Sequence, residues 1–423
     1  MAAPPRLVAP VLLVTCLSKP LALRAQQVLT LEDALHEARG ANAALPVARF
    51  DTVIARARIT EARGLVWPRL SVASDVHAGT PNQYSGNDGR LQAIADEDLY
   101  DGGGLRAGVK VAEAQARATG ARYRLAEKDI DFAVRVRYSE LLKTEEELAF
   151  RRAGIVRLQS YFASVQARQA AGQGVADDVL KTQVRLGAAT ADLEDAARRL
   201  DLIRFELNDL LGRTPDARLA LAPLPPPGPP PRDSTGEPWA TAPDVRSAEA
   251  DVDAAVSSVT VARAGRRPHL SLTADAGALP LFPGSEVGTG LNNGQGWGME
   301  LTFSLSWPLW DTGVYRARLE QARLGADRAR QVATAVRREA RLEWRRAFAE
   351  LWSRYRELLV RTGNVPVAQD SYLRAESLYR GGAATALDVL DAFTQWIDAS
   401  EAAAEAALGY RAAEARLLRW GTP

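Results

Sequence analysis

Residues 297–313 read WGMELTFSLSWPLWDTG. As far as Trp307, large apolar side chains alternate with small or polar ones, which predicts a β-strand of about ten residues. The apolar series has aromatic residues at both ends and consists of Trp297, Met299, Leu301, Phe303, Leu305 and Trp307. This length and the terminal aromatics favour a strand that crosses a membrane with the series facing lipid. The alternative is one face of a soluble β-sandwich.

The junction at the end of this stretch occurs twice in the chain. Asp311-Thr312-Gly313 repeats Asp101-Gly102-Gly103, and Asp388-Val389-Leu390 repeats Asp178-Val179-Leu180, both at an offset of 210 residues. Upstream of residue 70 the offset becomes 200, so the second copy carries about ten extra residues in a loop before Asp311. We infer an internal duplication of one long structural unit.

Each unit contains one very long predicted helix. Residues 104–170 keep a helical pattern without proline, and their 67 residues span about 100 Å. Residues 314–380 are the second copy, in which Gly363 and Pro366 predict a kink or a break. Shorter helices are predicted before each hairpin, at about 42–65 and 244–264. A further helix follows each glycine turn, at about 177–211 in the first half and from the Gly381-Gly382 turn to about Trp420 in the second.

Strand hairpins are predicted at about 69–100 and 269–308. The strand at about 91–100 has a poor pattern because Asp96-Glu97-Asp98 interrupts it, so its register is left open. The two shorter helices of each half together span about the length of the long one, which predicts that they run end to end beside it. The hairpin then lies at one end of each unit and the glycine turn at the other.

The remaining segments divide the chain. Residues 1–25 resemble a signal peptide cleaved after Ala25; the alternative is lipoprotein cleavage before Cys16, although Thr15 is unusual at that position. The first repeat covers 26–214 and the second 242–423. Between them, residues 215–241 hold a proline-rich segment that cannot be helical and is interpreted as an extended linker.

Composition and motifs exclude several classes. Lys plus Arg number 53 against 52 Asp plus Glu, so no basic excess indicates a nucleic-acid partner. The three histidines, His36, His77 and His269, are scattered rather than clustered as metal ligands would be. No P-loop or serine-nucleophile motif occurs. We therefore expect no enzyme, no cofactor and no metal site.

Several motifs, taken in order, resemble the TolC-like outer-membrane efflux proteins over essentially the whole mature chain. Leu29-Thr30-Leu31-Glu32-Asp33-Ala34-Leu35 is similar to the N-terminal signature of that family. Trp307-Pro308-Leu309-Trp310-Asp311-Thr312-Gly313 is similar to its strand-to-helix junction, with Leu99-Tyr100-Asp101-Gly102-Gly103 as a weaker twin. Residues 382–390 resemble the family's turn at the periplasmic tip, with 168–180 as their twin.

The resemblance implies a mainly α fold with a membrane β-barrel. Three chains would each give four strands to a shared twelve-stranded barrel in the outer membrane, and their long coiled-coil helices would form an α-helical barrel through the periplasm. Four strands cannot close a barrel alone, and open edges are not tolerated in lipid. The implied partners are two further copies, outer-membrane lipid, a periplasmic adaptor and an inner-membrane transporter.

The resemblance also assigns roles to the glycine turns, which otherwise are simple helix connections. It implies an adaptor-docking tip made of Gly172, Gly174, Val175, Asp178, Gly381, Gly382, Thr385 and Asp388. Nearby residues that could close the tube between chains are Arg374, Tyr379, Arg380 and Asp391; the alternative is a solvated surface with incidental ion pairs.

The function implied is a passive exit duct of a tripartite efflux system. A type I protein-secretion duct uses the same architecture and is not separated from it by the sequence. An alternative from a different functional class is a periplasmic coiled-coil scaffold without a pore, lipid-anchored at Cys16. The alternation at 297–307 separates the duct from the scaffold, because a scaffold needs no lipid-facing strand.

Overall fold

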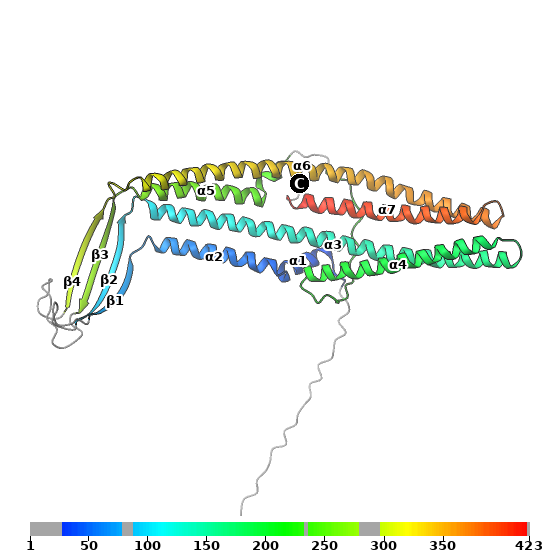
Figure 1. Cartoon of the computed structure of the whole chain (residues 1–423), viewed down its shortest axis with the longest axis horizontal. Helices are drawn as coiled ribbons and strands as arrows, with labels where there is room; N and C mark the ends of the chain where they lie inside the picture. The colour runs from blue at the N-terminus through cyan, green and yellow to red at the C-terminus, as the bar shows by residue number, and fades with distance from the viewer. Residues whose placement is uncertain (1–27, 78–87, 232–235, 279–296, 421–423) are drawn as a thin grey trace, which may run out of the picture.

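The molecule is elongated, with a β-sheet at one end and two tight helix turns at the other (Figure 1). The computed structural model describes residues 28–77, 88–231, 236–278 and 297–420. Its helices are α1 (Leu31–Ala41), α2 (Ala44–Gly64), α3 (Gly104–Ala170), α4 (Ala176–Leu210), the short 3-10 helix η1 (Pro238–Thr241), α5 (Pro243–Ala264), α6 (Val314–Arg380) and α7 (Ala386–Leu418). Its strands are β1 (Arg69–His77), β2 (Asp88–Tyr100), β3 (His269–Ala278) and β4 (Trp297–Ser306).

The two long helices have the predicted bounds and equal lengths of 67 residues. Helices α2 and α4 lie end to end along α3, and α5 and α7 lie in the same way along α6 (Figure 1). Helix α3 also packs against α5 and α7, so the two repeats interlock rather than stand apart. Within the described residues, no helix combines the length and the apolar character needed to cross a bilayer.

Of the kink or break predicted at Gly363 and Pro366, the break is wrong and the kink stays a prediction. Helix α6 is continuous from Val314 to Arg380 with Pro366 inside it. Proline has no N–H for the carbonyl four residues earlier, so the helix loses one hydrogen bond at this point. Leu358 and Tyr372, on either side, are buried in separate apolar clusters that include residues of α7. This packing continues across the missing bond and keeps one helix.

The repeated Asp-x-Gly motif forms the turn from strand to long helix. Asp101 Oδ1 accepts a hydrogen bond from the Gly103 N–H at 2.9 Å, and Asp311 Oδ1 accepts one from the Gly313 N–H at 3.1 Å. In both copies the other carboxylate oxygen accepts from an N–H in the first turn of the helix. Gly103 and Gly313 have φ of 88° and 95°, which explains why glycine recurs there.

The four strands form one antiparallel sheet in the order β1-β2-β3-β4. The doubtful second strand exists and pairs with both β1 and β3, with Ala95 opposite Leu70 and Ala274. A register shift between Asp98 and Tyr100 accommodates its end. The edges of the sheet are β1 and β4, whose outer backbone groups have no strand partner in the described chain.

Because side chains alternate along a strand, this register gathers most apolar side chains of the four strands on one face, with Ile94 on the other. The face contains Leu70, Val72, Leu91, Ala93, Ala95, Leu270, Leu272, Ala274, Ala276, Met299, Leu301, Phe303 and Leu305. The opposite face carries polar groups such as Asp96 and Thr273, which form a 2.8 Å hydrogen bond. Glu97 is an exception on the apolar face, close to the end where β2 meets α3.

The proline-rich linker is bound to the helices rather than being a free spacer. The buried Tyr138 hydroxyl of α3 donates toward the carbonyls of Leu29, at 2.8 Å, and Ala222, at 2.7 Å. Further along, the Tyr410 hydroxyl of α7 donates to the Gly228 carbonyl at 2.6 Å. The N-terminal segment and the linker are thus held against both repeats by tyrosines whose rings belong to the apolar core.

Replacing Asp311 by alanine should lower the stability of the helical part by about 1 kcal/mol, because two N–H groups at the start of α6 lose their acceptor. Asp311→Asn keeps one acceptor oxygen and should lose less. The measurement is the midpoint of the loss of helical circular dichroism on heating the detergent-solubilised protein. An Asp311→Ala midpoint equal to that of the native protein would show that the carboxylate does not cap the helix.

Candidate functional site

The turns at the helix end of the molecule are two copies of one helix-ending motif. After α3, the Gly172 N–H bonds the Gln169 carbonyl and the Gln173 N–H bonds the Arg168 carbonyl, at 3.0 and 2.9 Å. The same pair of bonds ends α6 at Gly382 and Ala383. Gly172 and Gly382 have φ of 70° and 78°, as this Schellman motif requires. Both glycines therefore hold a backbone conformation that branched residues rarely adopt.

The other two glycines of the proposed tip have different roles. Gly381 has φ of −80°, which any residue adopts, and its counterpart in the first repeat is Ala171. Gly174 is needed for space, because a Cβ there would lie 3.0 Å from the Gln169 nitrogen. The turns therefore differ in which glycines they require, although their hydrogen bonds match.

Thr385 and Val175 begin the helices that follow the turns, and they are not equivalent. The Thr385 hydroxyl accepts from the Asp388 N–H at 3.2 Å, and the Asp388 carboxylate accepts from the Thr385 N–H at 2.8 Å. The Thr385 backbone and side-chain hydrogen bonds lower the pKa of Asp388. Val175 occupies the same position before α4 without a side-chain cap and is 64 % exposed. Asp178, the twin of Asp388, lies half-buried in the first turn of α4.

Tyr379 lies inside the chain rather than on the tip surface. It is only 7 % exposed, and its ring centre lies 5.4 Å from that of Tyr161 on α3. The Arg168 guanidinium lies 4.7 Å from the centre of the Tyr379 ring and donates to the carbonyls of Tyr379 and Arg380, at 2.9 and 2.7 Å. Arg168 thus joins the end of α3 to the end of α6 by a cation–π contact and two charge-assisted hydrogen bonds.

The other proposed gate residues are not brought together within one chain. Arg380 pairs with Glu376 one turn earlier on α6. Arg374 and Asp391 are exposed and form no ion pair with any described residue. A gate built from these residues therefore stays a prediction about contacts between copies.

An aromatic cluster behind the turns makes the tip rigid. Tyr372 stacks on Trp396 with ring centres 5.6 Å apart, and Phe393 and Phe150 approach the same tryptophan edge-on. Burial, aided by the neighbouring Tyr379, raises the pKa of the Tyr161 phenol well above its usual value. The tips of the two repeats are therefore one packed unit.

A buried cluster of charged side chains lies on α3 between the aromatic cluster and the sheet. Sequence analysis did not identify it. Glu147 accepts from Lys143 and Arg151, both at 3.0 Å. Burial alone would raise the pKa of Glu147, but these hydrogen bonds outweigh it and lower the pKa. Arg151 also reaches Glu401 on α7. The spacing of four residues between Lys143, Glu147 and Arg151 was the available signal, but such spacing is common on exposed helix faces.

The remaining predicted positions lie elsewhere. Met299, Leu301, Phe303, Leu305 and Trp307 are all exposed in the single chain. Cys16 and the segment around it lie outside the described residues. The described part holds no group of three or more His, Cys, Asp or Glu that could bind a metal ion, and His269 pairs with Asp98 at 3.0 Å.

Comparison with known proteins agrees with this arrangement. The chain is 23% identical over 371 residues to the outer membrane efflux protein BepC of Brucella suis biovar 1, which covers 86% of this chain and 78% of BepC. The structure resembles the outer-membrane channel OprN, with a TM-score of 0.81, 23% identity and coverage of 92% and 89% of the two chains. It also resembles the open MtrE channel of Neisseria gonorrhoeae, with a TM-score of 0.80, 21% identity and coverage of 92% and 88%.

The family assignment rests on both repeats. The model of the family described as outer membrane efflux protein matches residues 34–213 and 239–420, which are most of the chain. The unmatched stretch between these segments contains most of the proline-rich linker. The duplicated helices, the four-stranded sheet and both glycine turns lie within the matched residues or directly between them. This chain belongs to the outer membrane efflux protein family.

Proposed function

We propose that three copies of this chain form a passive conduit that begins in the outer membrane and continues through the periplasm. The observation that carries the proposal is the apolar face of the sheet, which has exposed large side chains on both edge strands, such as Leu70 and Leu305. Two unpaired strand edges flank this face, and lipid offers no hydrogen bonds to satisfy them. Three sheets joined edge to edge satisfy every edge and turn the apolar face outward.

The helices extend the conduit on the other side. Each helix of 67 residues reaches about 100 Å from the sheet. The wall is made by α2, α3, α5 and α6 near the sheet and by α3, α4, α6 and α7 near the turns (Figure 1). Transport through this passive conduit is driven by an inner-membrane transporter, which is coupled to it through a periplasmic adaptor.

We infer that the adaptor docks on the two helix turns. They are the exposed end of the molecule opposite the sheet, and loops held by a rigid scaffold commonly carry binding sites. The aromatic cluster and Arg168 supply that rigidity. A type I protein-secretion duct would use the same surface. A scaffold without a pore is disfavoured, because it would leave the apolar sheet face in water.

The conduit itself is tested by planar-bilayer recording. Purified protein should migrate as a heat-sensitive trimer and give stepwise ion currents when it is added to the bilayer. The physical reason is that closure of the sheet needs three copies and leaves an open, polar interior. A chain that is monomeric and stable in detergent-free buffer, or one that gives no currents as a trimer, would contradict the proposal.

Arginine at Leu301 or Phe303 should impair membrane assembly. Each substitution places a charge on the apolar face, at a cost of about 2–4 kcal/mol near the bilayer centre. The neighbouring changes Thr302→Arg and Ser304→Arg are matched controls on the polar face and should be tolerated better. The amount of trimer in isolated outer membranes is measured for all four variants. Equal losses on both faces would indicate a soluble sheet instead.

The docking proposal is tested with aspartate at the two helix starts. Val175→Asp should add a cap that α4 lacks and raise the stability of that helix by about 0.5–2 kcal/mol. Thr385→Asp keeps a capping oxygen but brings a second carboxylate beside Asp388, so it should weaken the cap of α7 slightly. Both place a new charge on the docking surface, and we expect export in cells to be lost while the trimer level is unchanged. Val175→Ser and Thr385→Ser are uncharged capping controls. Normal export by the double aspartate variant would remove the turns from the docking surface.

A further inference from the structure

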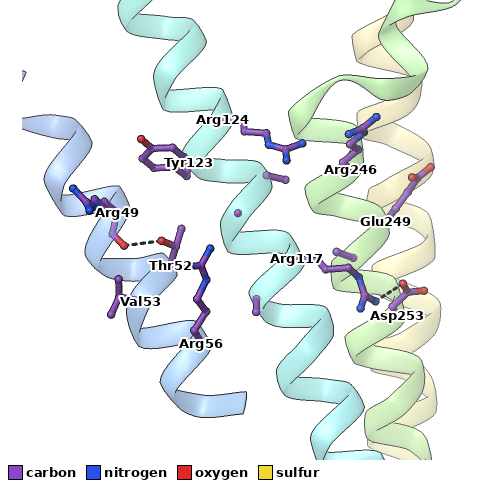
Figure 2. Close-up of a pocket in the computed structure, with 14 residues that line it drawn as sticks. Arg49, Thr52, Val53, Arg56, Arg117, Tyr123, Arg124, Arg246, Glu249 and Asp253 are labelled. Atoms are coloured by element: carbon purple, nitrogen blue, oxygen red, sulfur yellow. Dashed lines mark hydrogen bonds and ion pairs between the residues drawn. The ribbon is translucent and has the colours of Figure 1, made fainter. Parts of the chain in front are cut away.

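A groove lies between α2, α3 and α5, between the sheet and the middle of the molecule (Figure 2). Its volume is about 790 Å³, which is in the size range of small-molecule sites. Small residues of α3, Ala116, Gly120 and Ala121, form part of its lining. A Cβ added to Gly120 would meet no atom within 4 Å, so the space above this residue is open.

Positive charge dominates the groove. Five arginines line it against two carboxylates: Arg49, Arg56, Arg117, Arg124 and Arg246 face Glu249 and Asp253. Both carboxylates are already engaged, Asp253 with Arg117 at 2.9 Å and Glu249 with Arg337 of α6. In the part of the chain that the structure describes, Arg49, Arg56, Arg124 and Arg246 have no carboxylate within 4.0 Å.

Other arginines of the same helices do find partners. Arg63 of α2 pairs with Glu113 at 2.6 Å, and Arg122 of α3 pairs with Asp251 of α5 at 2.7 Å. The groove nevertheless brings together four arginines from three helices, Arg49, Arg56, Arg124 and Arg246, that have no such partner. Figure 2 shows Arg124 of α3 extending toward Arg246 of α5, so two like charges from different helices converge there. An anion between them would relieve that repulsion and accept hydrogen bonds from both.

The guanidinium groups of the groove arginines indicate which class of ligand the groove would bind. Each presents several N–H donors in a planar fork that fits the oxygens of a carboxylate or a phosphate. Arginines from three helices suit an anion with two or more such groups better than a single ion. The small residues of α3 in the lining leave room for a ligand of several non-hydrogen atoms.

The face of the wall that carries the groove is fixed by α3. Arg117, Arg124, Asp131 and Tyr138 are spaced by seven residues and so lie on one side of the helix. Asp131 holds α1 through Arg39, at 2.7 and 2.6 Å, and Tyr138 binds the linker. The groove thus shares a face with α1 and the linker. Three copies of these added segments would obstruct the interior of a conduit, so this face is the outer one.

We propose that the groove between α2, α3 and α5 is a binding site for multivalent oxyanions, carrying phosphate or carboxylate groups, on the outer surface of the helical wall. Its placement on the outside rests on the proposed conduit, whereas anion binding does not. Salt should weaken the binding strongly, because the arginines are exposed to solvent.

The experiment titrates pyrophosphate and citrate, separately, into the detergent-solubilised full-length trimer in phosphate-free, low-salt buffer, with calorimetric detection. The double variant Arg124→Gln/Arg246→Gln should raise the Kd at least about tenfold, since each lost guanidinium removes charge-assisted hydrogen bonds. Arg56→Gln, on α2, should raise it by a smaller factor. Arg122→Gln is the matched control, because it removes a charge from the same helix outside the groove and should change the Kd less than about twofold.

Binding of either anion that is lost in the double variant and kept in Arg122→Gln supports the site, and the preferred anion identifies the group it recognises. Equal affinity of the native and the double-variant trimer, or no binding of either anion, would overturn the proposal. Bilayer currents distinguish the outer placement from the conduit itself. The native trimer should conduct equally with and without saturating anion, whereas a block that disappears in the double variant would place the groove inside.

Discussion

Unpaired backbone at the edges of a four-stranded sheet is the constraint on which this structure depends. Among the described residues, strands β1 and β4 each leave one row of N–H and C=O groups without a strand partner. The same sheet has a face of exposed apolar side chains from all four strands. Water would satisfy the edges but not the face, and lipid would satisfy the face but not the edges. Only association with further copies satisfies both the edges and the face, so the sheet is completed by assembly. The two repeats of each copy must then present equal helices to a common wall, as α3 and α6 do.

The long helices were the most predictable part of the molecule, because a helical pattern sustained over 67 residues is bounded on each side by glycine turns. The junction motif was predictable for the same local reason, since Asp101 and Asp311 bond N–H groups at most four residues away. Local rules also produced the one clear error. Pro366 breaks an isolated helix more readily than one that is packed along a neighbour on both sides of the proline. The pairing of β2, which its own alternation left open, was settled by the flanking strands.

Contacts between distant residues were beyond sequence reasoning. The linker has no periodic pattern, and its partners Tyr138 and Tyr410 lie 84 and 182 residues away from the carbonyls they bind. Arg168 binds a carbonyl 211 residues away, and its counterpart in the second repeat is Leu378, so the duplication gave no hint of it. The arginine groove was hidden in the same way: its residues come from three helices, and an overall balance of 53 basic and 52 acidic residues conceals it. The proposed docking and gate residues were located by resemblance, and the structure then separated their local roles, assigning Thr385 to a cap and Tyr379 to the core.

Equal helix length also restricts how a protein of this kind can be lengthened or shortened. One residue inserted into α3 would turn everything beyond it by about 100° and move it by about 1.5 Å. Arg168 would then leave the end of α6, and the aromatic cluster would lose its register. Insertions or deletions that change the length of the helices therefore have to occur in both repeats together and in multiples of about seven residues. The helices that pack alongside must change by the same length. A longer designed variant would need whole heptads inserted into both α3 and α6. Natural variation in the length of these helices should likewise occur in whole heptads.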